Sequence, residues 1–371
     1  MAEALKNQYG ADVPHAIAGM VAAVHPSFNR AGFVRDALDG YEALALMPRG
    51  KKIAQALRRH LPQDYAQALA ILLASLDQPH GRDPSLSLAS FLYLPHTLFV
   101  AEYGLDHFEL SMQAQHALTQ RFTAEFSIRP FIERYPQATL RQLQAWARDP
   151  SAQVRRLVSE GTRPRLPWAP RLRQFQADPT PVLALLELLK DDPELSVRRS
   201  VANNLNDIGK DHPELLARTA QAWLRGASPE RAWIVGHALR SAVKRGEDGA
   251  LQVLGFGQPS RVSVSQVQIS PARAVMGGQV KIGFVLTNTE PRAQRVLVDL
   301  AVHYVKANGQ ARAKVFKLKA LALAPGQSVP LSKKLSLAEM TTRKHYPGQH
   351  LVEVLLNGQA QRLGVFELAS A

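Results

Sequence analysis

The chain has 371 residues and carries 45 Lys and Arg against 31 Asp and Glu, so its formal net charge is +14. This length predicts two or more domains, and the excess of cationic side chains predicts a polyanionic partner, because such side chains gain affinity by neutralising phosphates. The absence of cysteine excludes a disulfide framework, thiolate metal ligands and a cysteine nucleophile, and it fits a reducing compartment.

The N-terminal segment places acidic residues ahead of any apolar run, so we expect no secretory signal. No stretch reaches the ~18 consecutive apolar residues that a membrane span requires. None of the 12 His residues belongs to an H-x-x-x-H or H-E-x-x-H pattern, which argues against a metal site. These features predict a cytoplasmic protein without a metal or cofactor.

From the N-terminus to about residue 250, apolar residues recur at three- and four-residue spacing, as in Ile53, Leu57 and Leu61. Such spacing is typical of amphipathic helices, and no alternating run typical of a strand interrupts it. The first two thirds of the chain are therefore predicted to be helical. Trp146, Trp223 and Trp233 fall within these helices, and we expect them in the core.

A weak internal repeat lies inside the helical pattern. Asp149-Pro150 precedes a Val-Arg-Arg run at Val154, and Asp192-Pro193 precedes the same run at Val197, an offset of 43 residues. Ser228-Pro229 opens a third, looser copy. Asp or Ser before Pro is typical of a helix start, since the side chain caps exposed amides and Pro tolerates the first turn. This repeat predicts a HEAT-like solenoid of helical pairs, with an unrelated helical bundle as the alternative.

The hydrophobic period changes near residue 260. Short alternating runs rich in β-branched residues follow, and they predict strands at 262–269, 280–286, 296–302, 314–319 and 351–356. We expect an immunoglobulin-like sandwich without its disulfide, joined to the helical region by a linker at 255–259. The predicted domains are therefore a helical-repeat domain at 1–253 and a β domain at 254–371.

The β domain is predicted to be the more strongly basic part. Residues 256–371 hold 15 Lys and Arg against 5 Asp and Glu, a net charge of +10, which leaves +4 for the rest of the chain. A basic sandwich of this kind could clamp a nucleic acid duplex.

Candidate chemistry concentrates in the first copy of the repeat. A helix carrying Arg155 and Arg156 is predicted to end at Glu160 and Gly161, and glycine suits the left-handed position that ends many helices. Glu160 would then lie at the negative end of the helix dipole, where its charge is disfavoured by up to ~1 kcal/mol. It is either a functional carboxylate or a surface partner of Arg156.

The second copy of the repeat offers a second carboxylate. Aligning the two Val-Arg-Arg runs puts Asn203 opposite Glu160 and places Asp207 one turn further along the same face. Two acids on one edge of a basic solenoid could act together. The alternative is that Asn203, Asn204 and Asp207 form a ladder of hydrogen bonds between repeats.

An irregular Pro-rich loop follows Gly161 and carries one exposed aromatic candidate. Trp168 lies there outside any helical period, so it could stack on a base or contact a cation, or it could fill a gap between repeats. The loop also holds three arginines, Arg163, Arg165 and Arg171, and a helical pair of cations occurs further along the chain. As candidate contacts to DNA phosphates we name Arg155, Arg156, Arg163, Arg165, Arg199, Lys210, Arg240 and Lys244.

Common nucleotide and hydrolase motifs are missing from the sequence. It contains no G-x-x-x-x-G-K-[ST], no G-x-G-x-x-G after a strand and no G-x-S-x-G. Nucleotide-driven, dinucleotide-dependent and α/β-hydrolase chemistry are therefore not supported, and carboxylates and aromatics remain as the candidate reactive groups.

Four segments resemble a known family. They are ALALMPRGKKIAQALRRHLPQDY (43–65), FTAEFSIRPFIERYP (122–136), VSEGTRPRLPW (158–168) and VRRSVANNLNDIGKDHP (197–213). These runs are similar to the AlkC branch of the AlkC/AlkD DNA alkylation repair glycosylases, over residues ~15 to 250. Some members of that branch carry an immunoglobulin-like domain after the repeats, as the strand pattern predicts here.

The resemblance implies a monofunctional glycosylase that removes N3-methylated bases such as 3-methyladenine and 3-methylcytosine from double-stranded DNA, as a monomer and without flipping the base. It also implies that Glu125, Glu160 and Asp207 are the active-site acids and that Trp168 contacts the lesion. A DNA-binding role predicts association with the nucleoid within the cytoplasm. Lys210 near Asp207 leaves a lyase reaction as a less favoured option.

The residues themselves agree with this chemistry. A methylated cationic base is already a good leaving group, so an enzyme mainly needs to stabilise the positive charge that develops on the sugar, which carboxylates do. We assign the positioning of the attacking water to Asp207. The competing hypothesis is a non-catalytic scaffold that binds nucleic acid or protein through its repeats.

Overall fold

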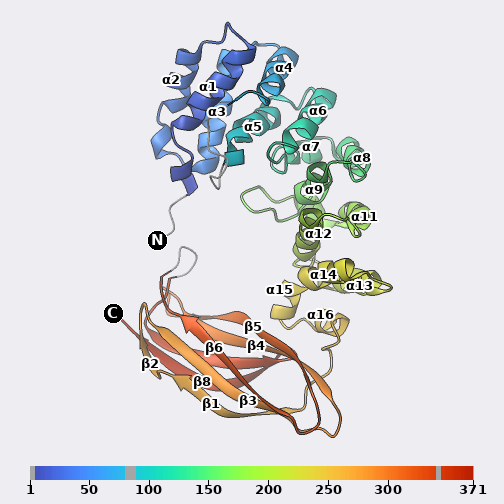
Figure 1. Cartoon of the computed structure of the whole chain (residues 1–371), viewed down its shortest axis with the longest axis vertical. Coiled ribbons are helices and arrows are strands. Elements are labelled where there is room, and N and C mark those ends of the chain that lie inside the picture. Colours follow the sequence, from blue (N-terminus) through green and yellow to red (C-terminus); the bar gives the residue numbers. More distant parts are fainter. Residues whose placement is uncertain (1–4, 80–88, 340–343, 371) are drawn as a thin grey trace. The chain divides into compact units, whose positions relative to one another are not determined.

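The computed structural model describes residues 5–79, 89–339 and 344–370 (Figure 1). It divides into two compact units. The first runs to Asp211 and also takes in residues 228–234, and the second holds residues 212–227 and everything from Val235 onward that the structure describes. Within the described ranges, no helix is long and apolar enough to cross a membrane.

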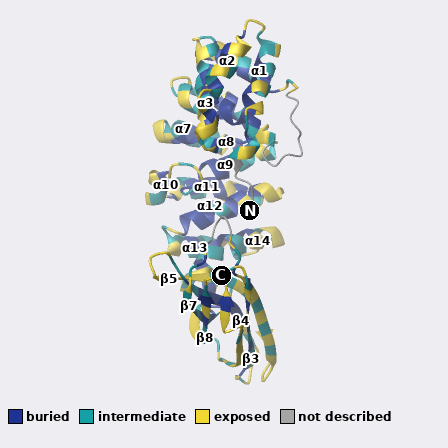
Figure 2. Ribbon diagram, turned by 90° about the vertical axis from the view of Figure 1, so that its left-hand side faces the viewer, coloured by how far each residue is buried: buried dark blue, intermediate teal, exposed yellow. Residues whose placement is uncertain are grey.

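The helices of the first unit pack in successive layers, and buried positions run along α8, α9, α11 and α12 where the layers meet (Figure 2). Its helices are α1 (Asp12–Val24), α2 (Arg30–Leu38), α3 (Leu46–His60), α4 (Tyr65–Ser75), α5 (Leu94–Tyr103), α6 (Phe108–Thr119), α7 (Arg129–Arg134), α8 (Pro136–Trp146), α9 (Ala152–Gly161), α10 (Arg173–Ala177), α11 (Thr180–Leu189) and α12 (Leu195–Ile208). Short 3-10 turns lie at Leu5–Gln8, Tyr41–Ala43 and Ala89–Tyr93.

The remaining helices follow Asp211. They are α13 (Pro213–Leu224), α14 (Pro229–Ala238), α15 (Arg240–Lys244) and α16 (Asp248–Val253). Trp146 and Trp223 are buried, as expected. The prediction for Trp233 is wrong, because the buried face of α14 is formed by Ile234, Val235 and Ala238, and Trp233 lies outside it with 39% of its surface exposed.

Equivalent contacts recur in the two copies of the repeat. Arg155 Nη1 donates to the carbonyls of Asp149 and Pro150 at 2.9 and 3.0 Å. Arg198, 43 residues later, donates in the same way to the carbonyls of Asp192 and Pro193. Since α9 also packs against α12, the internal repeat indicated by the sequence is present in the structure.

The start of each repeated helix differs from the prediction in the first two copies. Asp149 and Asp192 accept hydrogen bonds from the amides two residues later, at 2.8 and 2.9 Å, so each fixes a turn that precedes its helix. The helices begin only after these turns, at Ala152 and Leu195. In the third copy the prediction holds, because Ser228 accepts from the amide of Arg231 at 3.2 Å and α14 begins at Pro229.

The C-terminal strands form two sheets. Their bounds are β1 (Val262–Ser270), β2 (Arg273–Val275), β3 (Gln279–Asn288), β4 (Gln294–Val305), β5 (Ala311–Leu323), β6 (Ser328–Ser336), β7 (Gly348–Leu356) and β8 (Gln359–Ala369). One sheet has the order β1-β3-β6 and the other β2-β8-β7-β4-β5, and all pairs are antiparallel except β2 with β8. Alternate side chains, including Phe284, Tyr304 and Phe366, fill the core of the sandwich. The predicted order of a mainly helical region followed by a small all-β domain is confirmed.

Three of the strands, β2, β6 and β8, were not predicted from the sequence. β6 contains Pro330 and two adjacent lysines, which weaken a strand signal, although an edge strand tolerates Pro because it needs fewer ladder donors. β8 contains Gly364 and a polar first half, and β2 spans three residues. The strands β2 and β6 pair with strands that are distant in sequence, β8 and β3 respectively. β8 instead pairs with β7 across a short turn at Asn357 and Gly358, a local signal that could have revealed it.

The segment between the last helix and the first strand is packed rather than free. Phe256 is buried with Leu251 and Leu297, and the Arg295 guanidinium lies 5.0 Å from the centroid of its ring. Helices α15 and α16 therefore belong to the same compact unit as the sandwich. The division at 253/254 remains a proposal, and it marks the change of secondary structure rather than the edge of this unit.

Candidate active site

Three carboxylates predicted from the sequence lie in one network of hydrogen bonds and ion pairs. Glu160 is in the last turn of α9, Asp207 is in the last turn of α12, and Glu125 lies in the turn before α7. Their side chains are 7%, 2% and 13% exposed. Buried carboxylates are stable only when they are paired and hydrogen-bonded, so the cations around them determine what the site can do.

Arg163 joins two of the acids. Its Nη1 donates to Glu160 Oε1 at 2.6 Å, and its Nε donates to Asp207 Oδ2 at 2.8 Å. Burial opposes the charge of this guanidinium, but the attraction of Glu160 and Asp207 exceeds that effect and raises the pKa of Arg163. Arg163 was predicted to contact DNA phosphates, yet its side chain is only 11% exposed and is engaged by both acids. That predicted role is untested, and the geometry assigns Arg163 a structural one.

The Glu160 side chain is buried, and Arg156 is the most distant of its partners. Its Oε2 accepts from Ser200 Oγ at 2.6 Å, whereas Arg156 Nη2 lies 3.9 Å from the same oxygen. Ser200 in turn accepts from Ser159 Oγ at 2.7 Å, so the carboxylate is tied to both α9 and α12. The unfavourable end of the helix dipole is offset by these partners and by Arg163.

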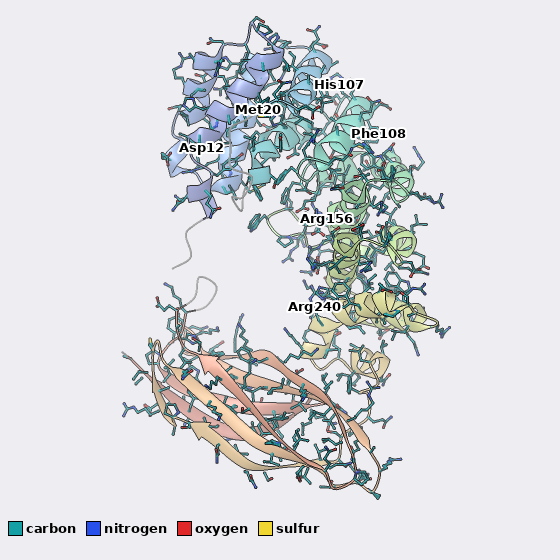
Figure 3. The ribbon with its side chains drawn as sticks, viewed as in Figure 1. Asp12, Met20, His107, Phe108, Arg156 and Arg240 are labelled. Carbon is teal, nitrogen blue, oxygen red and sulfur yellow. The ribbon has the colours of Figure 1, made fainter. Side chains whose placement is uncertain are left out.

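Glu125 reaches the same network through Arg156. Arg156 Nη2 donates to Glu125 Oε2 at 3.0 Å, and Thr123 Oγ1 donates to the same oxygen at 2.9 Å. Arg156, labelled in Figure 3, therefore lies between two of the three acids, closer to Glu125 than to Glu160.

Asp207 completes the network and has a more exposed partner. Lys210 Nζ donates to Asp207 Oδ1 at 2.7 Å, and the Lys210 side chain is 38% exposed. Asn204 behaves as the alternative hypothesis of a hydrogen-bond ladder between repeats expects. Its side-chain amide donates to the carbonyl of Ser159 and to Thr162 Oγ1. The ladder does not describe Asp207, which is held by two cations.

The loop after α9 presents Trp168 to solvent. Trp168 is 60% exposed and has a φ of 63°, a left-handed conformation that is unusual for a bulky residue. Gly161 is not left-handed, contrary to the prediction. A Cβ there would lie 2.6 Å from Ile128 Cγ2, so glycine is needed for close packing against the turn before α7.

Sequence reasoning missed Arg129, the first residue of α7. Its side chain is buried, and it donates to the carbonyls of Gly161, Arg163 and Pro170. The signal that could have found it is a single arginine within an otherwise apolar run, Phe-Ser-Ile-Arg-Pro-Phe. An arginine in such a run needs buried acceptors.

The chain was compared with known proteins and solved structures. Residues 263–370 match the family model for the C-terminal Ig-like domain of the uncharacterised protein YhaZ. The chain is 36% identical over 358 residues to the uncharacterized protein YhaZ of Bacillus subtilis (strain 168), an alignment that covers 96% of this chain and 97% of that protein. It is 41% identical to the solved Pseudomonas fluorescens alkylpurine DNA glycosylase AlkC bound to DNA containing an abasic site analog, with a TM-score of 0.92 and coverage of 99% and 100%.

This chain belongs to the AlkC family. The membership predicted from four sequence segments, including the C-terminal immunoglobulin-like domain, is confirmed. The match extends over both the helical region and the sandwich, because nearly all of both chains is aligned.

Several cations named as phosphate contacts in this AlkC-family chain are already engaged by carboxylates. Arg155 Nε donates to Asp192 Oδ2 at 2.6 Å, and Arg165 Nε donates to Asp211 Oδ2 at 2.9 Å. Each pair joins one repeat to the next. Arg199 is exposed.

The last two candidate phosphate contacts, Arg240 and Lys244, lie on α15 in the other compact unit. Lys244 is exposed, and Arg240 donates to the carbonyl of His237. All of these phosphate contacts remain predictions.

The acids do not form a metal site. Over the ranges that the structure describes, no three His, Asp or Glu side chains converge in a way that could hold a metal ion. Each carboxylate instead faces an arginine or lysine, which places fixed cations and anions side by side in the AlkC-family site.

Proposed function

We propose that this chain is a DNA glycosylase of base excision repair that hydrolyses the N-glycosidic bond of cationic N3-alkylated bases, 3-methyladenine and 3-methylcytosine. Family membership supports the class of enzyme, since the solved relative is an alkylpurine DNA glycosylase. The observation that carries the proposal is the buried network of Glu125, Glu160 and Asp207. A protein that only binds phosphates has no need of three acids paired with its cationic side chains.

The proposed chemistry needs charge stabilisation more than a general acid. The alkylated base is cationic, so it leaves as a neutral molecule when it takes the electrons of the bond between C1′ and nitrogen. Positive charge then develops on the sugar, and carboxylates stabilise it by ~10²–10³-fold per group. Water adds to C1′ and gives up one proton, which Asp207 accepts and passes to solvent, and the products are the neutral free base and an abasic sugar.

Asp207 is the proposed residue that orients this water, with Glu160 and Glu125 contributing negative charge. Arg163 holds Asp207 Oδ2 and Glu160 Oε1 at a fixed spacing. Lys210 is the more exposed of the two cations on Asp207. We propose that the cationic substrate displaces Lys210 from Asp207 Oδ1, which leaves that oxygen to face the sugar.

A hydrolytic, monofunctional reaction is supported by the same contact. In the unbound protein Lys210 donates to Asp207 Oδ1, so it is engaged by a carboxylate rather than held free as an amine nucleophile. Trp168 is the proposed contact to the lesion, and its exposure suits stacking at the surface without flipping the base into a deep pocket.

The proposed partner is double-stranded DNA bound by a monomer in the cytoplasm, close to the nucleoid. Arginines and lysines beside the acids would hold the phosphates on either side of the lesion. The sandwich, with a net charge of +10 in residues 256–371, would clamp the duplex.

The test is release of free base by purified protein. DNA treated with a methylating agent that produces 3-methyladenine and 3-methylcytosine is incubated with the protein, and the released bases are quantified by chromatography. The proposal predicts release well above the spontaneous rate measured with heat-inactivated protein. Spontaneous release only, together with intact DNA binding, would favour the scaffold hypothesis instead.

A further inference from the structure

Arg129 makes three hydrogen bonds that have no part in the proposed chemistry. Its Nη1 donates to the carbonyls of Gly161 and Arg163 at 3.0 and 2.9 Å, and its Nη2 donates to the carbonyl of Pro170 at 2.5 Å. The first two carbonyls lie where the loop leaves α9, and the third lies near its far end. One guanidinium therefore ties the two ends of the loop together.

The loop between these ends carries two residues of the site. Arg163 binds both Glu160 and Asp207, and Trp168 is presented to solvent. Trp168 holds a left-handed φ of 63°, a conformation that costs ~1–3 kcal/mol and persists only when its surroundings fix it. Leu166 is buried beneath the loop, and Arg165 is anchored on Asp211. Arg129 supplies the contacts that close the loop.

Burying the charged side chain of Arg129 costs free energy. It is 3% exposed, and its hydrogen bonds go to backbone carbonyls rather than to a carboxylate. Burial lowers the pKa of Arg129 to about 10, so it is still charged at neutral pH. Within the described residues its Nε has no hydrogen-bond partner. A lysine at this position could not reach the same carbonyls, because it lacks the planar fork of the guanidinium.

We infer that Arg129 is a positioning residue that fixes Arg163 against the two acids and holds Trp168 in its exposed, left-handed conformation. The inference rests on the proposed glycosylase function for its kinetic consequence. Its structural consequence, the order of the loop, does not depend on that function.

The kinetic arm compares Arg129→Lys with Arg134→Lys. Arg134 is the control, since it lies on the same helix, is exposed, and packs over the ring of its neighbour Tyr135. Misplacing a catalytic group by about 1 Å costs ~10²-fold in rate. We expect R129K to slow single-turnover release of 3-methyladenine by about that factor, while its affinity for undamaged DNA changes less than about twofold. R134K should behave as wild type.

The structural arm needs neither DNA nor activity. The protein is labelled with 5-fluorotryptophan, and Trp168→Phe assigns the Trp168 resonance among the four tryptophans. R129K should shift or broaden the Trp168 fluorine resonance and leave those of the buried Trp146 and Trp223 in place. R134K should leave all of them unchanged.

The two arms separate failure of this inference from failure of the proposed function. A folded R129K with a wild-type Trp168 resonance and a wild-type release rate would overturn the inference. If wild-type protein releases no base, the proposed function fails and the fluorine spectrum alone decides the inference. If R129K does not fold, Arg129→Gln, which keeps donors without a buried charge, is carried through both arms with the same criteria.

Discussion

Arg163 Nε donates to Asp207 Oδ2 at 2.8 Å and thereby connects two copies of the repeat. The same guanidinium binds Glu160, so the last turns of α9 and α12 are bridged by one buried cation. Each acid is almost fully buried, and Arg163 is the cation that the two acids share. Because Arg163 pairs with both acids, a substitution at Arg163 changes the surroundings of Glu160 and Asp207 together.

Replacing Arg163 with Met should destabilise the protein strongly. Removing one partner of a buried ion pair costs ~3–5 kcal/mol, since it leaves uncompensated charge in the interior. Urea denaturation measures the change in the free energy of unfolding. The control is Arg231→Met, which removes a guanidinium from the more exposed Asp191 and should cost much less. Equal losses in the two variants would contradict the bridge.

Replacing Trp168 with Ala should affect lesion binding more than stability. The side chain is 60% exposed, so its loss removes little buried surface. Stacking of an aromatic side chain on a base contributes ~1–3 kcal/mol, and we expect affinity for lesion-containing DNA to fall by about that amount. Fluorescence anisotropy with a labelled duplex measures it, and Trp233→Ala on α14 is the control. Unchanged lesion affinity in W168A would remove Trp168 from the contact.

Protonation of His96 should make the fold less stable in mild acid. Burial lowers the pKa of His96 from 6.5 to about 4 in the folded protein. Above pH 6.5 both folded and unfolded states are neutral at this residue, so it contributes no pH dependence. Between pH 6.5 and 4 the unfolded state binds a proton that the folded state does not, so stability falls as the pH falls.

The matched variant for this effect is His96→Gln. From pH 7 to pH 5 the wild type should lose about 2 kcal/mol more than H96Q, because each pH unit across that window contributes ~1.4 kcal/mol. Urea denaturation of both proteins over this range gives the difference. Parallel pH profiles would show that His96 is not titrating as its burial requires.

The basic sandwich should contribute to the salt dependence of DNA binding. Truncation near residue 255 is a poor test, since it would expose Leu251, which packs against Phe256 and Leu297. Neutralising exposed cations on β5 in the full chain, as in Arg312→Gln with Lys319→Gln, avoids this problem. Each lost phosphate contact should reduce the slope of log K against log salt by ~0.9. An unchanged slope would mean that these two cations do not touch DNA.

Much of the architecture was predictable because it rests on local periodicity. The Val-Arg-Arg alignment correctly placed Glu160 and Asp207 in the last turns of equivalent helices. Asn203 is the position equivalent to Glu160, and Asp207 lies one turn further along the same face, so the repeat predicted that the two acids share a face. The helix starts were wrong in two copies because an Asp side chain can fix a turn before a helix as readily as it can cap one.

The roles of the arginines were not predictable from composition. From the sequence, Arg163 was predicted to be one of several phosphate contacts. Only the fold shows that its side chain, in the loop after α9, pairs with Asp207 on α12. Arg129 acts on carbonyls more than 30 residues away, which no local pattern reveals. The missed strand β6 has the same cause, because it is fixed by pairing with the distant strand β3 rather than by its own alternation.

The most direct test of the account is single-turnover release of 3-methyladenine by Asp207→Asn, measured beside its affinity for the same DNA. Asparagine keeps the shape of the side chain but removes its charge. The account predicts that release falls by ~10²–10³-fold while the dissociation constant changes little. Asp191→Asn, an ion-paired aspartate outside the site, should behave as wild type. Wild-type release by D207N, or a parallel loss of release and DNA binding, would contradict the assignment of Asp207 to the reaction.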